Sequence, residues 1–202
     1  KAINKDDGTA MNNYAYMLQE SQEVGVNYEE AIIFYKMAIA KGITAAMNNY
    51  ASMLLYGQGV EVNYEEAIKY YKMAIDKGDP DAMCCYAQIL QQGQGVEVDI
   101  EESIKYLKMA IEKGHPKAMN NYAYILQEGQ GVEVNYEEAI KYYKMAIDKG
   151  ITAAMNNYAS MLLHGQGVEV NYEEAIKYYK MAIDKGDTDS MNIYANMLIN
   201  GN

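Results

Sequence analysis

Pairs of adjacent glutamates recur along the chain, and Glu65-Glu66 is a representative pair. Two neighbouring carboxylates can act as acid and base in catalysis or bind a divalent cation. This pair follows Asn63, a residue type that caps helix N-termini, and so falls in the first turn of an expected helix. Negative charge there stabilises the helix dipole by about 0.3–1 kcal/mol. We therefore interpret the glutamate pairs as helix-start signals rather than as a catalytic or metal site.

Three further patterns contain residue types that can bind a phosphate or a metal ion. Residues 57–59 (Gly-Gln-Gly) have glycines that suit a phosphate loop, but no strand is expected before them, and we interpret them as a turn. His115 and His164 lack a second metal ligand at a matching spacing and are expected at the surface. Met47 and Met73 are expected in the core rather than in a copper site. We predict no catalytic residue, no metal site and no cofactor, and hence no enzyme.

The two cysteines, Cys84 and Cys85, are adjacent in an expected helix. Their side chains then point about 100° apart, which is poor geometry for a disulfide. Two free thiols are more typical of a reducing compartment, so the cysteines favour a cytoplasmic location.

Composition and charge narrow the range of partners. The formal net charge is -11, which disfavours binding to nucleic acid and to anionic membrane surfaces. No apolar run is long enough to insert into a membrane. The chain has 21 Tyr and 15 Met but no Trp and a single Phe, a bias that indicates copying of one short segment.

A period of 36 residues organises the whole chain. It is marked by a methionine in each copy, namely Met11, Met47, Met83, Met119, Met155 and Met191. Within one copy, small and apolar residues from Ala46 to Leu55 recur at helical spacing, and Gly57 ends this first helix. A second helix starts after Asn63, carries an apolar stripe that includes Tyr71, and ends at Gly78.

The pattern therefore predicts an all-α fold, an α/α solenoid wound as a right-handed superhelix from two-helix repeats. We expect one array over residues 1–202, with about five complete repeats and partial units at both ends. The chain opens on Ala2-Ile3, which matches the end of a second helix, and stops at Gly201, after a first helix. In the first loop, Ser21 and Glu23 replace the two glycines of later copies.

A longer period is superimposed on the first. Residues 43–55 are identical to residues 151–163, three repeats later, and the following position is Tyr56 in one copy and His164 in the other. This indicates duplication of a three-repeat block. Identity between copies therefore reflects shared origin as well as function.

The repeat resembles the Sel-1-like repeat family, which is related to tetratricopeptide repeats. The resemblance covers essentially the whole chain and rests on matches in one copy to Ala46, Gly57, Gly59, Val60, Ala67, Tyr71, Ala74 and Gly78. At the family's acidic position Asp99 matches, whereas Asn63 stands there in this copy. The resemblance implies a scaffold or adaptor for protein complexes.

We accordingly expect a protein-binding scaffold that takes a protein or an extended peptide along the first helices of its repeats. Asparagine amides can bond a peptide backbone, and tyrosines suit contact surfaces. The candidate groove residues are Asn12, Tyr16, Asn48, Ser52, Gln88, Asn120, Tyr124, Asn156, Ser160, Asn192 and Asn196. Leu55 is expected on the same helix face, which looks into the groove by analogy with tetratricopeptide arrays. The alternative is a structural module that forms homo-oligomers by stacking its open repeat ends head to tail.

Overall fold

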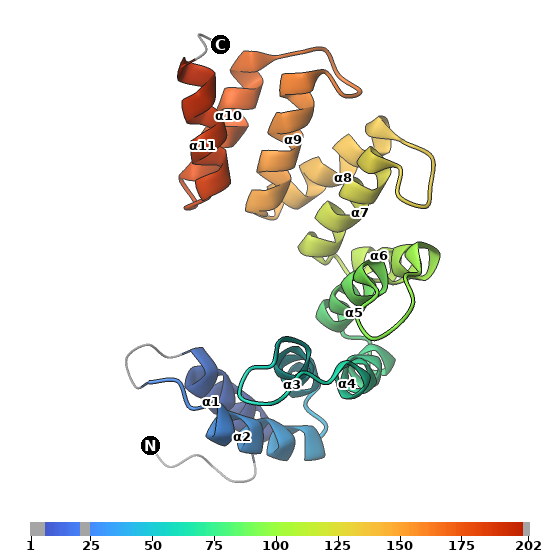
Figure 1. The fold of residues 1–202 in the computed structure, drawn as a ribbon, viewed down its shortest axis with the longest axis vertical. Coiled ribbons are helices and arrows are strands. Elements are labelled where there is room, and N and C mark those ends of the chain that lie inside the picture. The colour runs from blue at the N-terminus through green and yellow to red at the C-terminus, as the bar shows by residue number, and fades with distance from the viewer. Residues whose placement is uncertain (1–6, 21–24, 200–202) are drawn as a thin grey trace. The chain divides into compact units, whose positions relative to one another are not determined.

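A computed structural model describes residues 7–20 and 25–199 of the chain. These residues form eleven α-helices and no strand, so the all-α repeat prediction is confirmed (Figure 1). The helices are α1 (Gly8–Glu20), α2 (Tyr28–Ala40), α3 (Thr44–Tyr56), α4 (Tyr64–Asp76), α5 (Pro80–Gln92), α6 (Ile100–Glu112), α7 (Pro116–Glu128), α8 (Tyr136–Asp148), α9 (Thr152–His164), α10 (Tyr172–Ile183) and α11 (Thr188–Ile199).

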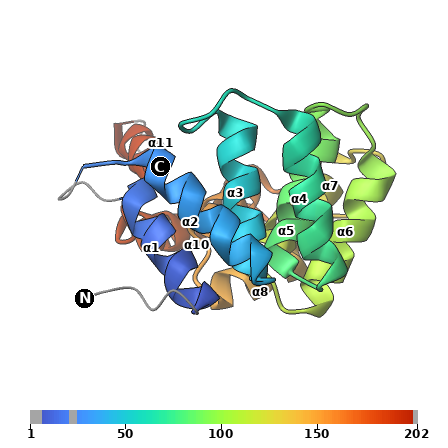
Figure 2. The same cartoon turned by 90° about the horizontal axis from the view of Figure 1, so that it is seen from below.

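The odd-numbered helices are the first helix of each repeat, here called helix A, and the even-numbered helices are the second, helix B. The chain divides into two compact units, residues 1–110 and 111–202. In the first unit α1 packs on α2 and α3 on α4, and α2 and α4 each pack on the next helix A, an arrangement visible in Figure 2. In the second unit α7 pairs with α8, α9 with α10, and α10 with α11. The single array over residues 1–202 stays a prediction.

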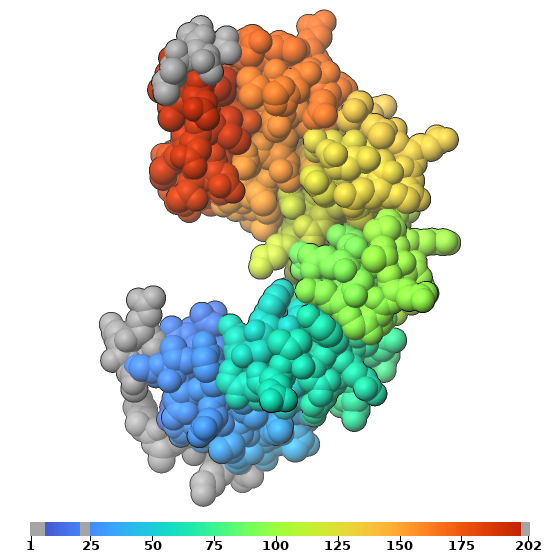
Figure 3. All heavy atoms as spheres, viewed as in Figure 1, coloured from blue at the N-terminus to red at the C-terminus, as the bar shows by residue number. Residues whose placement is uncertain are grey.

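Helix A buries the stripe that the sequence predicts. In α3, Ala46, Met47, Tyr50, Ala51 and Leu54 are all buried. The alanines let the neighbouring helix approach closely, and the larger side chains fill the remaining space. Figure 3 shows the outer surface of the protein in the view of Figure 1. The predicted core position of Met47 is thus confirmed, and Met73 of α4 is half-buried against the core.

The loop glycines serve the backbone and the packing between repeats. Gly57 ends α3 in the left-handed conformation, with a φ of 69°. Gly59 has a φ of 70°, and a Cβ atom there would collide with the Cβ atom of Tyr28 in the preceding repeat. The segment 57–59 is therefore a turn, as predicted, and its second glycine also lets two repeats meet closely.

Helix B starts and packs as the sequence predicts. The side chain of Asn63 accepts a hydrogen bond from the backbone N–H of Glu66 over 3.0 Å. Glu65 and Glu66 occupy the first turn of α4, which confirms their reading as helix-start residues. Tyr71 is fully buried in the core.

Aromatic side chains join the helices within and between repeats. The rings of Tyr50 and Tyr70 meet edge to face at 5.1 Å, which links α3 to α4. From the preceding repeat, the Lys36 ammonium lies over the Tyr50 ring, 5.2 Å from its centroid. The same contact joins Lys72 to Tyr86 and Lys144 to Tyr158. A lysine of one helix B thus contacts the aromatic pair of the following repeat.

Two sequence-based expectations were wrong. His115 is not a surface residue: it is 8% exposed and caps α7, its Nδ1 accepting from the backbone N–H of Ala118 over 3.1 Å. Leu55, which was expected to face the groove, is buried. His164 is exposed, as predicted. The features expected at Ala2-Ile3, Ser21, Glu23 and Gly201 lie outside the described residues.

In the described part of the chain, no helix has the length and apolar character needed to cross a membrane.

Candidate protein-binding surface

The first predicted row of groove residues is made of asparagines on helix A, and two of them tie neighbouring repeats together. Asn12 is buried, and its Oδ1 accepts a hydrogen bond from Asn49 Nδ2 over 3.2 Å. Its own Nδ2 lies 3.4 Å from Asn13 Oδ1. In the second unit, Asn120 accepts from Asn157 over 3.1 Å and donates to Asn121 over 3.2 Å. The side-chain amides of Asn12 and Asn120 therefore form hydrogen bonds within the protein.

The remaining asparagines of the row differ in environment. Asn48 is half-buried, and its Oδ1 is buried without a hydrogen-bond partner. Asn156 is half-buried and Asn192 is exposed. The row is thus not uniform, and Asn192 is its one exposed member among the described residues.

The second predicted row, one turn later on each helix A, is more open. Tyr16, Gln88, Tyr124 and Asn196 are exposed, and Ser52 and Ser160 are half-buried. Each unit therefore presents one large exposed aromatic side chain of this row, Tyr16 in the first unit and Tyr124 in the second.

A chain of hydrogen bonds lies beneath each of these exposed tyrosines. The Tyr143 hydroxyl donates to Gln127 Oε1 over 2.8 Å, and Gln127 Nε2 donates to Gln166 Oε1 in the next loop over 3.0 Å. In the first unit the equivalent bonds join Tyr35, Gln19 and Gln58 over 2.8 and 2.9 Å. Helix B, helix A and the following repeat are held together by three polar side chains.

Burial governs the electrostatics of these hydroxyls. Removal from water raises the pKa of Tyr143 above its ordinary value of 10.0, and the nearby Glu128 carboxylate and Tyr124 raise it further. Burial likewise raises the pKa of Tyr35, with Tyr16 and Glu20 as neighbours. Both hydroxyls therefore remain protonated donors at neutral pH.

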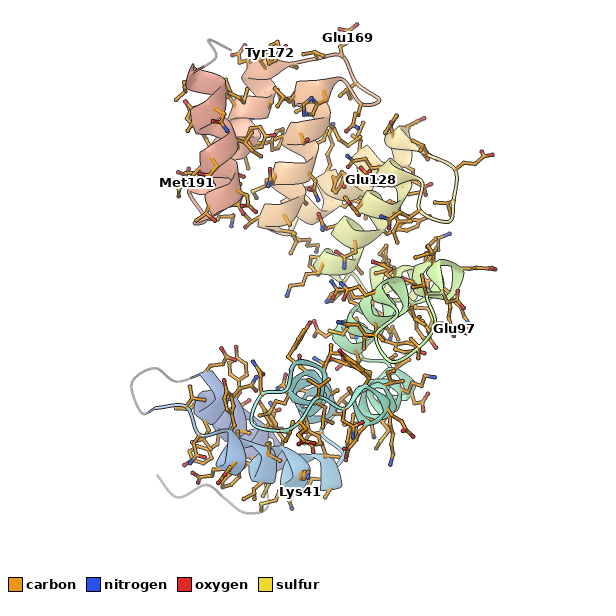
Figure 4. All side chains as sticks on the ribbon, in the orientation of Figure 1. Lys41, Glu97, Glu128, Glu169, Tyr172 and Met191 are labelled. Carbon is orange, nitrogen blue, oxygen red and sulfur yellow. The ribbon has the colours of Figure 1, made fainter. Side chains whose placement is uncertain are left out.

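The same neighbours define a recurring surface feature, an exposed tyrosine with a glutamate four residues later. Tyr16 and Glu20 lie one turn apart on α1, and Tyr124 and Glu128 lie one turn apart on α7. Glu128 is labelled at the end of α7 in Figure 4. An aromatic face beside a carboxylate suits a lysine or arginine side chain. We call these two pairs the Tyr-Glu sites.

Other surfaces offer less for binding or catalysis. Within the described ranges, no group of three or more His, Cys, Asp or Glu side chains is placed to hold a metal ion. A hollow of about 260 Å³ at the start of α10 is lined by Asn171, Glu173, Glu174 and Lys177. The first three are the N-cap and first-turn residues of this helix. The exposed loop valines, such as Val98, are spread one per repeat along the loop edge.

These features define a class of protein: an α/α repeat protein with a polar, aromatic helix A surface. The chain belongs to the Sel1 repeat family, whose members are generally non-catalytic protein-interaction scaffolds. The family model, Sel1 repeat, matches residues 8–43, 44–79, 80–115, 116–151 and 152–187. The resemblance predicted from the sequence is thereby confirmed.

Solved structures with this fold come from several bacteria. A Sel1 repeat protein from Oxalobacter formigenes is 28% identical, with a TM-score of 0.87 over 98% of this chain and 80% of that one. The protective antigen c5321 of uropathogenic Escherichia coli, described as having an SLR fold, is 27% identical, with a TM-score of 0.80 over 96% of this chain and 42% of that one. The immunity protein Pa5087 from Pseudomonas aeruginosa, at 21% identity and a TM-score of 0.69 over 91% of this chain and 67% of that one, shares the fold. No curated protein matches the sequence.

Sequence reasoning missed the hydrogen-bond chains and the glutamates of the Tyr-Glu sites. A signal for both was present. Gln19-Glu20 and Gln127-Glu128 stand 108 residues apart, at positions where α3 has Leu55-Tyr56 and α9 has Leu163-His164. The glutamine also recurs as Gln91 in α5, where it donates to Ser103. A polar residue at a position that other copies fill with leucine indicates a contact other than core packing.

Proposed function

We propose that this protein is an interaction scaffold that binds a positively charged, extended segment of a partner protein along helix A. The observation that carries the proposal is the recurrence of the Tyr-Glu site, once in each unit. Each site is exposed, and the hydrogen-bond chain beneath it ties the underlying helices together. A rigid support lowers the entropy lost when a ligand binds.

The negative net charge of the chain also favours a positively charged ligand. The chain carries a net charge of -11, so a basic segment is attracted over long range and its association is accelerated. Lysine or arginine would lie over the ring of Tyr16 or Tyr124 and pair with the following glutamate. Within each unit, half-buried polar groups on the next helix A would bond the peptide backbone. They are Ser52 on α3 in the first unit, and Asn156 with Ser160 on α9 in the second.

Cross-linking tests this proposal. The intact chain, with a photo-cross-linking residue in place of Gln88 on helix A, is used to capture partners from a cell lysate for identification by mass spectrometry. A matched variant carries the same residue in place of Lys105, which is exposed on helix B. Partners cross-linked from Gln88 and not from Lys105, through a Lys- or Arg-rich segment, support the proposal. Equal cross-linking from both positions contradicts it.

Self-assembly through the repeat ends is a second candidate, favoured by the exposure of apolar side chains on the end helices. Met17 of α1 is 61% exposed, whereas the equivalent Met53 of α3 is 0% exposed. Leu198 of α11 is 59% exposed, whereas Leu162 of α9 is 2% exposed. Figure 4 shows Met191, which is also exposed, on the same α11. Light scattering over a concentration series separates the candidates: growth of mass without a partner supports self-assembly.

A further inference from the structure

Helix α2 has lost two charges that the other helices B carry. It differs from α4, its equivalent in the next repeat, at three positions, which are Ile33 for Lys69, Phe34 for Tyr70 and Ala40 for Asp76. The remaining helices B also have a lysine at the first of these positions and an acidic residue at the last. Phe34 has a role inside the repeat, because its ring meets that of Tyr14 edge to face with the centroids 4.8 Å apart. No such contact accounts for Ile33 and Ala40.

The two changed positions lie on one exposed face of α2. Ile33 is 58% exposed and Met37 is 37% exposed, and Ala40 is exposed as well. Residues spaced by one and two turns share a helix face, so these three form a continuous apolar line, here called the α2 stripe. The opposite face of the helix, with Tyr35 and Ala38, is buried in the repeat. The stripe therefore plays no part in the core.

This face points to solvent in every repeat, including those that follow another repeat. The residues equivalent to Ile33 are all exposed, and they are Lys69, Lys105, Lys141 and Lys177. A preceding repeat thus does not cover the position. Single exposed apolar side chains are ordinary on a protein surface. An apolar line in which both charged positions of the other copies have been exchanged is a feature of α2 alone among the described helices.

The charges beside the stripe are complementary to those of a second copy of α2. In an antiparallel pair of α2 helices with a two-fold axis at the level of Tyr35, Ile33 of one copy faces Met37 of the other. Glu29 and Lys41, which stand at equal distances on either side of Tyr35 in the sequence, then face each other twice across the axis. Both residues are exposed. Lys41 is the C-cap residue of α2 and is labelled at the end of this helix in Figure 4.

The lost charges are those that would oppose such a pair. Position 40 of one copy faces Glu30 of the other, so an acidic residue there would place two carboxylates together, and Ala40 avoids this repulsion. A lysine at position 33 would lose water over Met37 without gaining a partner for its charge. Ile33 instead buries apolar surface at the same place. The small side chain of Ala40 also lets the two helices approach closely.

We propose that α2 forms the contact of a two-fold dimer of this chain, with the two α2 stripes packed antiparallel and Glu29 paired with Lys41 of the other copy. One helix of each copy makes the contact, which is less than the roughly 1,200 Å² of a stable interface, so the dimer exchanges with monomer. A two-fold pair closes at two copies, unlike head-to-tail stacking through the repeat ends. The stripe lies on a helix B, so the proposal does not rest on the binding surface of helix A.

Sedimentation equilibrium of the intact chain over a wide concentration series tests the dimer. The double variant Ile33→Lys with Ala40→Asp introduces the residues that α4 carries at these positions, so its fold should be retained. We expect the parent to approach twice the monomer mass and the double variant to dimerise at least about tenfold more weakly. Val98→Lys, which changes a side chain of matched exposure (60%) on a loop, should dimerise like the parent. A parent that stays monomeric, or a double variant that associates equally, overturns the proposal.

A charge exchange tests the antiparallel arrangement in the same experiment. Glu29→Lys alone, or Lys41→Glu alone, places like charges opposite each other and should weaken dimerisation by about threefold or more at low salt. The variant with both substitutions restores opposite charges across the axis and should dimerise within about twofold of the parent. Circular dichroism checks that each variant is folded. Folded single variants that dimerise like the parent, or a combined variant that recovers nothing, overturn the pairing of Glu29 with Lys41.

Discussion

Asn49 Nδ2 donates a hydrogen bond to Asn12 Oδ1 over 3.2 Å and thereby joins the first helices of two successive repeats. The Asn49→Ala substitution leaves this buried acceptor without its donor, so we expect a loss of about 1–3 kcal/mol in the free energy of unfolding. Gln88→Ala, at an exposed position of α5, serves as control and should change it by less than about 0.5 kcal/mol. Urea titration followed by circular dichroism measures both. Equal effects would show that the asparagine pair does not join the repeats energetically.

Removal of a tyrosine hydroxyl should have opposite effects at two equivalent positions. Tyr143→Phe deletes the donor to Gln127 and is expected to destabilise the protein by about 1–2 kcal/mol. Tyr71→Phe deletes a hydroxyl that has no partner, and is expected to leave stability unchanged or raise it. Both rings are fully buried, so packing is matched between the variants. Thermal unfolding that ranks Tyr71→Phe below Tyr143→Phe would contradict the hydrogen-bond assignments.

Alanine substitutions at Gly59 and Gly114 distinguish the cost of a steric clash between repeats from the cost of a strained backbone conformation. Both have a positive φ, but a Cβ atom at Gly59 meets Tyr28, whereas at Gly114 it meets nothing within 4 Å. Gly114→Ala should cost about 1–2 kcal/mol from backbone strain alone. Gly59→Ala should cost about 1–3 kcal/mol more, because two repeats must move apart. Similar unfolding midpoints for the two variants would remove the packing role assigned to Gly59.

Alkaline pH should weaken the fold. Burial raises the pKa of Tyr143 above 10.0, and a hydrogen bond to Tyr158 raises the pKa of Lys144 above 10.5. A raised folded-state pKa means that the folded chain binds more protons than the unfolded chain above pH 10, so stability falls as pH rises from there. Titration of Tyr143 and Lys144 should change the free energy of unfolding little between pH 7 and 9. Tyr143→Phe should reduce the slope above pH 10 in denaturant titrations, and an unchanged slope would contradict the assignment.

Most of the fold could be predicted from the sequence because it repeats. Ala46 and Met47 recur at helical spacing, and Asn63 and Gly57 mark helix ends by local backbone chemistry that needs no knowledge of neighbours. The helix boundaries and the buried positions of helix A could be predicted from these signals. His115 was misplaced because its burial depends on packing around a helix start.

The candidate surface was harder to predict, since it depends on contacts between repeats. Asn12 and Asn156 occupy equivalent positions in the sequence, but the first is buried in a pair with Asn49 and the second is half-exposed. No local pattern tells an asparagine that bonds the next repeat from one that faces water. Gln19 likewise gains its role only because Tyr35 and Gln58 meet it in space.

The most direct test of the account is calorimetric titration of a Lys/Arg-rich peptide, taken from the cross-linked partner, into the intact protein and two variants. Tyr16→Ala with Tyr124→Ala removes both exposed rings of the Tyr-Glu sites. Tyr172→Ala removes a ring of matched exposure, 46% against 44% for Tyr124, at the start of helix B (Figure 4). We expect the double variant to bind at least about tenfold more weakly, since cation–π and area losses of about 0.5–1 kcal/mol or more arise at each site, and Tyr172→Ala to bind like the parent. Unchanged affinity in a folded double variant, or an equal loss in Tyr172→Ala, would contradict binding along helix A.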